Sequence, residues 1–271
     1  MQSNMWRRII SLLLALALIP NLCWAGADFD GVDDEIDCGS NASLDNLSAM
    51  TISLWANVDT FVAGEVLVAK GNTGWRWRLG GSGTNNLEIR IDYNTQDAWR
   101  VTSDSSITLD VWQHFLLTWT GSSTATNIKI YVNGTETSYA STQNGSTTRS
   151  DDSASNLWIG TIDGTTSFID ASITEVAIWN MVLSADQIVL LAKSKVKRMP
   201  LQLSDPDADG TNELVGYWPM DEVADGASAD LATFFDLSGN GNNGNPDNGA
   251  NNTGMTGVAE SVLSYPDEFA Q

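Results

Sequence analysis

Hydrophobic and polar side chains alternate most clearly in the stretch 112–139. Positions 112–120 alternate with a period of two, which is the repeat of a β-strand, and positions 128–132 do the same. The second run is followed by Asn133-Gly134, the dipeptide best suited to a type I′ turn because both central residues need a positive φ. The chain then returns through 136–139. This stretch therefore predicts two strong strands and a hairpin with which the other strands must pack.

Shorter alternating runs occur along the rest of the chain, separated by turns rich in Gly, Ser and Asn. They cover residues 27–39 (strand, tight turn, strand), 50–58, 66–70, 75–79, 87–93, 99–102, 157–162, 173–179 and 214–218, with a weaker run at 232–235. Short strands spaced by roughly 8–12 residues are typical of an all-β sandwich or barrel.

One helix is predicted at residues 184–198. Ser184 and Gln187 form a capping box, in which the two side chains satisfy free amides at the helix start. Basic residues gather toward the other end, where cations suit the helix dipole, and Pro200 is expected to end the helix. We interpret the basic cluster as a solvated helix end; a docking patch is the alternative.

The first 25 residues have the features of a secretory signal peptide. Arg7-Arg8 precedes an apolar run, and Ala25 closes a segment suited to cleavage before Gly26. A membrane anchor is the alternative, but the apolar run is shorter than the roughly 20 residues that a spanning helix needs. We therefore expect a secreted protein, extracellular or on the cell surface, that is not inserted in a membrane after cleavage.

The chain is strongly acidic, with 13 basic and 34 acidic residues and a net charge of −21. This balance argues against nucleic acids and anionic membranes as partners, because phosphate binding needs a basic surface. It suits cation binding, or simply a solvated acidic surface. After cleavage one cysteine would remain, Cys38, which excludes an internal disulfide. Its apolar surroundings indicate a small buried side chain, with an intermolecular bridge as the alternative.

Several motifs, in order, resemble those of bacterial laminin-G-like domains of the concanavalin A-like lectin/glucanase superfamily. They are Phe29–Asp34, Ile52–Trp55, Trp112–His114, Tyr131–Gly134, Glu175–Ile188, Leu214–Glu222 and Asp236–Gly244. The resemblance implies a two-sheet antiparallel jelly roll over residues 26–244, in which 201–244 closes the domain and 245–271 forms a polar tail. It also implies a secreted or surface module that binds glycans or proteins, often with structural calcium. Thr174-Glu175 stands where the family usually has Asp-Glu, which weakens the case for a calcium ligand on that strand.

The acidic segment after the helix is a candidate calcium loop. Acidic side chains occupy alternate positions at Asp205, Asp207 and Asp209, Gly210 stands where a calcium loop turns sharply, and Glu213 is at the ninth position. The twelfth position is a glycine, so the bidentate glutamate of a full EF-hand is missing. A solvated acidic linker is the alternative.

A second candidate calcium site pairs two distant segments. Asp236 and Asn240 lie in a Gly/Asn loop, and Asp33 or Asp34 in the N-terminal turn would complete the site. Such loops can supply carbonyl as well as carboxylate oxygens. The alternative is a turn stabilised by its own side-chain hydrogen bonds.

A candidate glycan site lies on the strands over residues 75–102. One face carries Trp75, Trp77, Trp99 and apolar neighbours and is expected to be core. We expect the opposite face to carry the charged side chains Arg76, Arg78, Glu88, Arg90, Asp92 and Arg100. These residues are either cross-strand charge pairs or the lining of a concave sheet that offers arginines to the carboxylate or sulfate groups of an acidic glycan.

Catalysis has little support in the sequence. Glu35-Ile36-Asp37 begins the acidic pattern of laminarinase-type glycosidases, but the next residues do not supply the third acid. His114 is the single histidine and belongs to a strand motif, so zinc sites and Cys-His catalysis are nearly excluded. No nucleophile elbow or phosphate loop is present.

The sequence thus predicts a secreted, non-catalytic, lectin-like module that binds carbohydrate or a surface or extracellular protein and is stabilised by calcium. A structural subunit of an extracellular assembly, with self-association, is the alternative from another class. A glycoside hydrolase is the third hypothesis.

Overall fold

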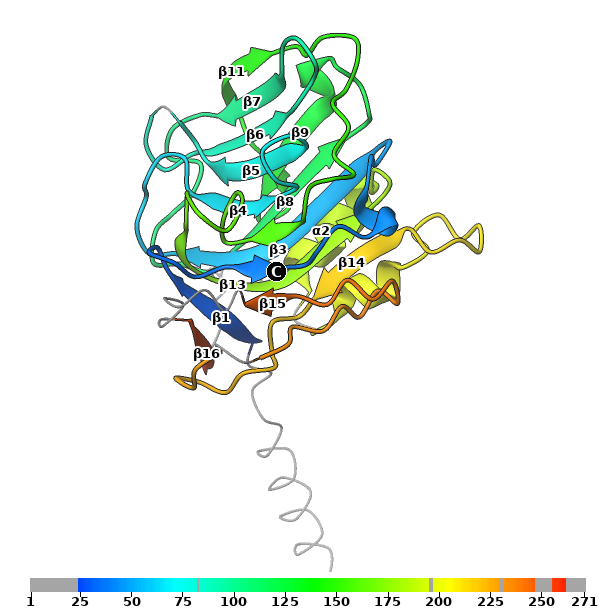
Figure 1. The fold of residues 1–271 in the computed structure, drawn as a ribbon. Coiled ribbons are helices and arrows are strands. Elements are labelled where there is room, and N and C mark those ends of the chain that lie inside the picture. The colour runs from blue at the N-terminus through cyan, green and yellow to red at the C-terminus, as the bar shows by residue number, and fades with distance from the viewer. Residues whose placement is uncertain (1–23, 82, 195–196, 230–231, 247–254, 262–271) are drawn as a thin grey trace, which may run out of the picture.

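Two antiparallel sheets face each other in the computed structural model, which describes residues 24–81, 83–194, 197–229, 232–246 and 255–261 (Figure 1). The first sheet, sheet A, runs in the order β10-β9-β8-β3-β13-β1-β16, and β14 also pairs with β13. Its strands are β1 (Trp24–Asp30), β3 (Met50–Val58), β8 (Gln113–Trp119), β9 (Ile128–Val132), β10 (Thr135–Glu136), β13 (Asp170–Trp179), β14 (Leu214–Trp218) and β16 (Thr256–Ser261).

The second sheet, sheet B, runs in the order β11-β7-β6-β5-β4-β12-β2-β15. Its strands are β2 (Ile36–Asp37), β4 (Val66–Ala69), β5 (Trp75–Leu79), β6 (Leu87–Ile91), β7 (Ala98–Thr102), β11 (Tyr139–Gln143), β12 (Trp158–Ile159) and β15 (Asn245–Pro246). Three short 3-10 helices, η1 (Ala42–Leu44), η2 (Ala125–Asn127) and η3 (Met199–Leu203), and the α-helix α2 (Ala185–Lys193) lie between strands. The predicted two-sheet antiparallel sandwich with one helix is confirmed.

The main core fills the space between the sheets. The inward residues of β3 and β8 pack there with Trp75 and Trp77 of β5, whose side chains are at most 1% exposed. This confirms that these two tryptophans belong to the core. Cys38 lies in the same core at 3% exposure, as expected for a small buried side chain.

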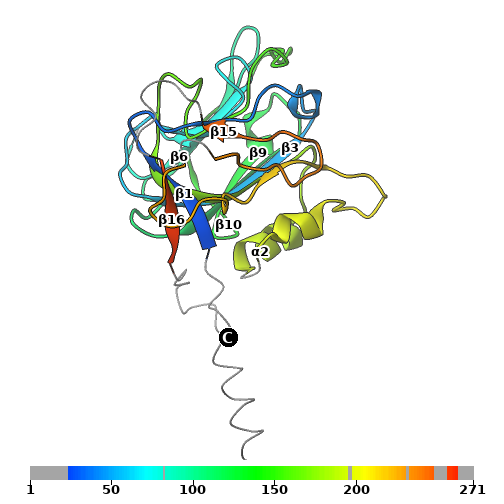
Figure 2. The ribbon, with the colours of Figure 1, turned by 60° about the horizontal axis from the view of Figure 1, so that its bottom comes forward.

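Sheet A is covered on its other face by the segment that follows β13. Leu116 of β8 packs there with Ile188 and Leu191 of α2 and with Leu203 of η3. Figure 2 shows α2 lying along the side of the sandwich. Strands of sheet A are therefore buried on both faces, which accounts for the unbroken burial of β8.

The Asn133-Gly134 turn is confirmed, with φ values of 51° and 78°. The turn joins β9 to β10, but the chain then leaves sheet A. Residues 139–143 form β11, which pairs with β7 in sheet B. The return strand of the hairpin is therefore only two residues long, and the rest of the segment crosses between the sheets.

The helix is shorter than predicted. It begins with the expected capping box at Ser184 but ends at Lys193, because Ser194 has an extended backbone with ψ 127°. Arg198 has a left-handed backbone, and Pro200 lies inside η3 rather than terminating α2. Among the described residues, Lys197 and Arg198 of the predicted basic helix end therefore lie outside α2.

The expected polar tail, residues 245–271, contains two strands within its described part. β15 pairs with β2 in sheet B, and β16 pairs with β1 in sheet A. Residues 256–261 therefore form a paired strand, while residues 247–254 and 262–271 lie outside the described chain. The short, small-residue sequence of β16 gives no strand pattern, since its position is set by pairing with β1.

The predicted signal segment lies outside the described residues except for Trp24 and Ala25, which begin β1. Cleavage after Ala25 would leave the rest of β1 paired with β13 and β16. Within the described chain, no helix combines the length and the apolar character that crossing a bilayer demands.

Candidate functional site

The outer face of sheet B carries most of the predicted glycan-site residues. Ion pairs join Arg76 to Asp92 and Arg78 to Glu88, with nitrogen–oxygen distances of 3.0 and 2.7 Å. Arg90 lies 3.4 Å from the same Glu88 carboxylate. The structure therefore brings these five side chains together, and each arginine has an acidic partner.

A sixth charged residue, Asp97, completes this face. Its carboxylate lies 4.0 Å from Arg76 and 3.8 Å from Arg90. Three arginines thus face three acids, so this part of the sheet has no net charge. Burial raises the pKa of Asp92, and Arg76 opposes that shift. The arrangement matches the cross-strand charge pairing foreseen from the sequence.

Arg100 does not lie on this face. It pairs in register with Ile89, a core residue, so its side chain starts on the inner face of sheet B. Its guanidinium donates to the carbonyl of Ile128, 2.5 Å away, and stacks 3.2 Å above the Tyr139 ring. Placing Arg100 on the charged face was therefore wrong; it joins the two sheets at one end of the sandwich instead.

The same register moves Trp99 to the outer face. Trp99 lies opposite Arg90 on one side and Gln143 on the other, and it is half-buried. The sequence analysis assigned it to the core because it is apolar. The length of the loop between β6 and β7 fixes the register, and it places small Ala98, not Trp99, opposite core Ile91.

A second half-buried tryptophan, Trp158, stands in the same cross-strand row. The row is formed by directly paired residues of successive strands, namely Trp158, Ala69, Arg76, Arg90, Trp99 and Gln143. The two tryptophans are four strand spacings apart, or about 19 Å. We call these six residues the outer row.

Part of the outer row is covered. Ile162, in the loop after β12, packs on Val66 and Ala69 of β4. Trp158 packs against Gly164 in the same loop, since a Cβ at Gly164 would lie 2.8 Å from the indole ring. The open part of the outer face is therefore the surface over β5, β6, β7 and β11, where Arg90 and Trp99 lie.

A shallow hollow of about 570 Å³ lies elsewhere, between residues 37–41 and 241–246. Most of its polar groups already have partners within the protein. Asp37 accepts hydrogen bonds from Gly39 and Asn156, and Asn242 donates to the Val215 carbonyl. None of the described residues that line the hollow is aromatic. It is therefore a weaker candidate for sugar binding than the outer face.

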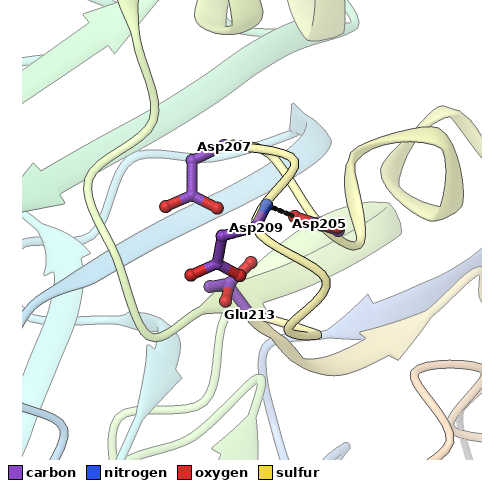
Figure 3. A group of neighbouring side chains, drawn as sticks. All are labelled: Asp205, Asp207, Asp209 and Glu213. Atoms are coloured by element: carbon purple, nitrogen blue, oxygen red, sulfur yellow. Dashed lines mark hydrogen bonds between the residues drawn. The ribbon is translucent and has the colours of Figure 1, made fainter.

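The acidic loop between η3 and β14 brings all four predicted calcium ligands together. One carboxylate oxygen from each of Asp205, Asp207, Asp209 and Glu213 lies within 4.8 Å of the others. Figure 3 shows the carboxylates of Asp209 and Glu213 meeting, while Asp205 accepts a hydrogen bond from the Asp209 amide. Gly210 has a φ of 91°, the conformation for which a glycine is needed at this turn.

The second predicted calcium set does not form one group within the described residues. Asp33 and Asp34 cluster with Asp30 instead. The Asp236 carboxylate accepts from the amides of Tyr217, Ser238 and Asn242. This loop matches the alternative, a turn held by its own hydrogen bonds.

Asn240 belongs to the same hydrogen-bonded turn. Its side-chain amide donates to the carbonyls of Leu214 and Val215. Asp34, by contrast, is fully buried, and its Oδ1 has no hydrogen-bond partner within the described part of the chain; burial raises its pKa to about 7.

His114 is part of the framework of sheet A. Its Nε2 lies 2.8 Å from the Ser53 hydroxyl, and its ring lies beside Trp55. The backbone of His114 exchanges hydrogen bonds with Asn133, which anchors the hairpin turn. Burial lowers the pKa of His114 to about 3, so the ring is neutral at physiological pH.

Glu35 and Asp37, which begin the glycosidase-like acidic pattern, are a buried residue and a hydrogen-bonded residue of the framework. Glu35 is 5% exposed, and both oxygens of Asp37 accept hydrogen bonds from the protein. Both oxygens of the Asp37 carboxylate are therefore used in hydrogen bonds that hold β2 in place.

Two packed antiparallel sheets, one with a partly open face of arginine and tryptophan, define a lectin-like β-sandwich. The chain belongs to the laminin G-like domains of the concanavalin A-like lectin/glucanases superfamily, whose profile matches residues 30–189. No curated protein sequence matches the chain significantly.

Solved structures show the same fold. A candidate carbohydrate-binding protein from Bacteroides ovatus superposes with a TM-score of 0.61 at 17% identity, over 90% of this chain and 61% of its own. This chain therefore spans less than two thirds of that protein. Weaker similarity extends to the binding domain of botulinum neurotoxin serotype G, with a TM-score of 0.46 at 15% identity, over 62% of this chain and 42% of its own.

Proposed function

We propose that this protein is a secreted, non-catalytic carbohydrate-binding module whose ligand lies on the open part of the outer face of sheet B. The observation that carries this proposal is Trp99, a half-buried indole that the register places beside Arg90 and Gln143. A tryptophan offers a large flat surface for a sugar ring, and neighbouring amide and guanidinium groups can donate hydrogen bonds to the hydroxyls of the sugar.

A neutral glycan suits this face better than the acidic glycan considered from the sequence. Every arginine there already has an acidic partner, and the carboxylate of Glu88 serves both Arg78 and Arg90. An anionic sugar would have to displace those carboxylates. Hydroxyl groups can instead bond to the remaining donors and acceptors, as small sets of polar groups do in most ligand sites.

The family membership supports the binding role. The chain has the fold of a candidate carbohydrate-binding protein, although at 17% identity that likeness extends only to the fold. Asp37, the acid closest to a glycosidase pattern, is committed to structural hydrogen bonds. These features favour binding without turnover.

The test is a glycan array probed with the wild-type chain and with Trp99→Ala. Loss of a stacking tryptophan at a binding site should weaken affinity by about 10-fold or more. Trp112→Ala is the matched control, because Trp112 is also half-buried but immediately precedes β8 of sheet A. Unchanged binding by Trp99→Ala, or equal loss in the control, would reject this face as the site. Retention at high salt would support a neutral ligand.

A further inference from the structure

One carboxylate oxygen of Glu213 has no hydrogen-bond partner among the residues that the structure describes. The residue is only 9% exposed, and its Oε2 is buried without a donor nearby. A buried carboxylate oxygen without a partner is costly, because it loses its hydration and gains nothing in return. A proton or a cation bound to this oxygen would remove that cost.

The surroundings of the Glu213 carboxylate are acidic. Asp205, Asp207 and Asp209 each place a carboxylate oxygen within 4.8 Å of a Glu213 oxygen and of one another (Figure 3). Negatively charged carboxylate oxygens at such short distances repel one another. A divalent cation bound here would neutralise the repulsion between the carboxylates and would also give the Glu213 carboxylate its missing partner.

We propose that residues 205–213 bind one calcium ion through the carboxylates of Asp205, Asp207, Asp209 and Glu213. Calcium prefers six to eight oxygen ligands, so water and a loop carbonyl would complete its shell. The incomplete protein shell places the expected Kd at about 10⁻⁴–10⁻³ M, the range of extracellular calcium modules.

The bound ion would fasten this loop to its surroundings. The Asn180 amide, just after β13, donates to the Glu213 carbonyl, and Gln187 of α2 donates to the Pro206 carbonyl. Calcium therefore acts on the segment that covers sheet A, on a different sheet from the proposed glycan face. The two proposals can fail independently.

The test uses EDTA-treated full-length protein titrated with calcium chloride by calorimetry. The Tm is measured without calcium and at saturating calcium. Calcium should release or absorb heat and raise the wild-type Tm by about 3 °C or more at saturation. In Glu213→Gln, affinity should fall about 10-fold or more. In EDTA that variant should melt at the wild-type temperature or above it, because a like-charge contact is gone.

Glu65→Gln is the matched control. Glu65 is a buried glutamate whose Oε2 also has no partner among the described residues, and it lies outside this group. It should respond to calcium as the wild type does. Calcium-dependent NMR shifts should centre on the amides of Asp209 and Gly210. An absent calcium response, a wild-type response in Glu213→Gln, or shifts confined to 30–34 would overturn the proposal.

Discussion

Arg76 and Arg90 lie directly opposite each other on neighbouring strands of sheet B. Two like charges in that position destabilise a sheet unless counter-charges are supplied. Asp97, in the loop between β6 and β7, lies within 4.0 Å of both guanidinium groups, and Asp92 forms an ion pair with Arg76. The loop acid is thus the shared counter-ion of the pair.

Replacing Asp97 by Asn should therefore destabilise the protein. The loss should be about 0.5–1 kcal/mol of unfolding free energy at low salt, because the groups are partly solvated. The loss should shrink at high salt, where charges are screened. Urea unfolding at low and at 1 M salt measures it. A double-mutant cycle with Arg90→Gln is the control, and a coupling free energy near zero would contradict a shared counter-ion.

Stability should rise as pH falls from about 7 toward 5. Burial raises the pKa of Asp34, Glu65 and Glu175 to about 7 in the folded state, from ordinary values near 4. Protonation of these acids thus favours folding, and their contribution is lost as pH rises through 7. His114 acts in the opposite direction below about 6.5, because the unfolded chain takes up its proton while the buried ring does not.

The acids outnumber the histidine, so the net slope should be negative, on the order of 1–3 kcal/mol per pH unit between 5 and 6.5. Chemical denaturation in EDTA at several pH values measures it. Glu65→Gln removes one titrating group and should flatten the slope. A stability that rises steadily with pH over this range would contradict the burial of these acids.

Tyr217→Phe should lower the free energy of unfolding by about 1–3 kcal/mol, because the Tyr217 hydroxyl donates to the buried Glu175 carboxyl at 2.8 Å. Glu175 sits at the irregularity in β13 with a φ of 54°, so its position depends on such contacts. Tyr93→Phe is the control. The Tyr93 hydroxyl has no hydrogen-bond partner among the described residues, and its removal should cost little. Equal losses in the two variants would reject a specific role for the Tyr217–Glu175 bond.

Gly257→Ala should disturb β16. A Cβ at this position would lie 2.3 Å from the Ala224 carbonyl oxygen, so the strand or its neighbour must shift. Overpacking of this kind typically costs about 1–3 kcal/mol. Hydrogen exchange should show faster exchange of the amides of Ala27 and Gly257, which are paired in the ladder. Unchanged protection and stability would show that β16 tolerates the larger side chain.

Strand positions were predictable where side chains decide them. The strands at 50–58, 75–79, 128–132 and 214–218 have the bounds that their alternation indicated, because burial on the inner face requires those side chains. The type I′ turn was predictable for a similar reason, since Asn133-Gly134 favours a single backbone geometry.

Hydrophobic patterning did not predict the features that depend on strand pairing or loop length. Arg100 and Trp99 each lie on the face opposite to the predicted one, because hydrophobicity does not determine the strand register across the β6–β7 loop. Strand β16 has no pattern of its own. The acidic loop was found because its ligands lie close together in sequence. Asp30, Asp33 and Asp34 also lie close together in sequence, but Asp33 or Asp34 was predicted to pair with the distant Asp236 and Asn240.

The pairing of β1 with β16 also constrains how this chain matures. A ribosome makes β1 first and β16 more than two hundred residues later, so a sheet edge stays open for most of synthesis. An open edge of this kind can accept a strand from a second molecule. Strand β16 therefore covers an edge that would otherwise be open to a second molecule, and a chain truncated before residue 256 should be the form most in need of a chaperone.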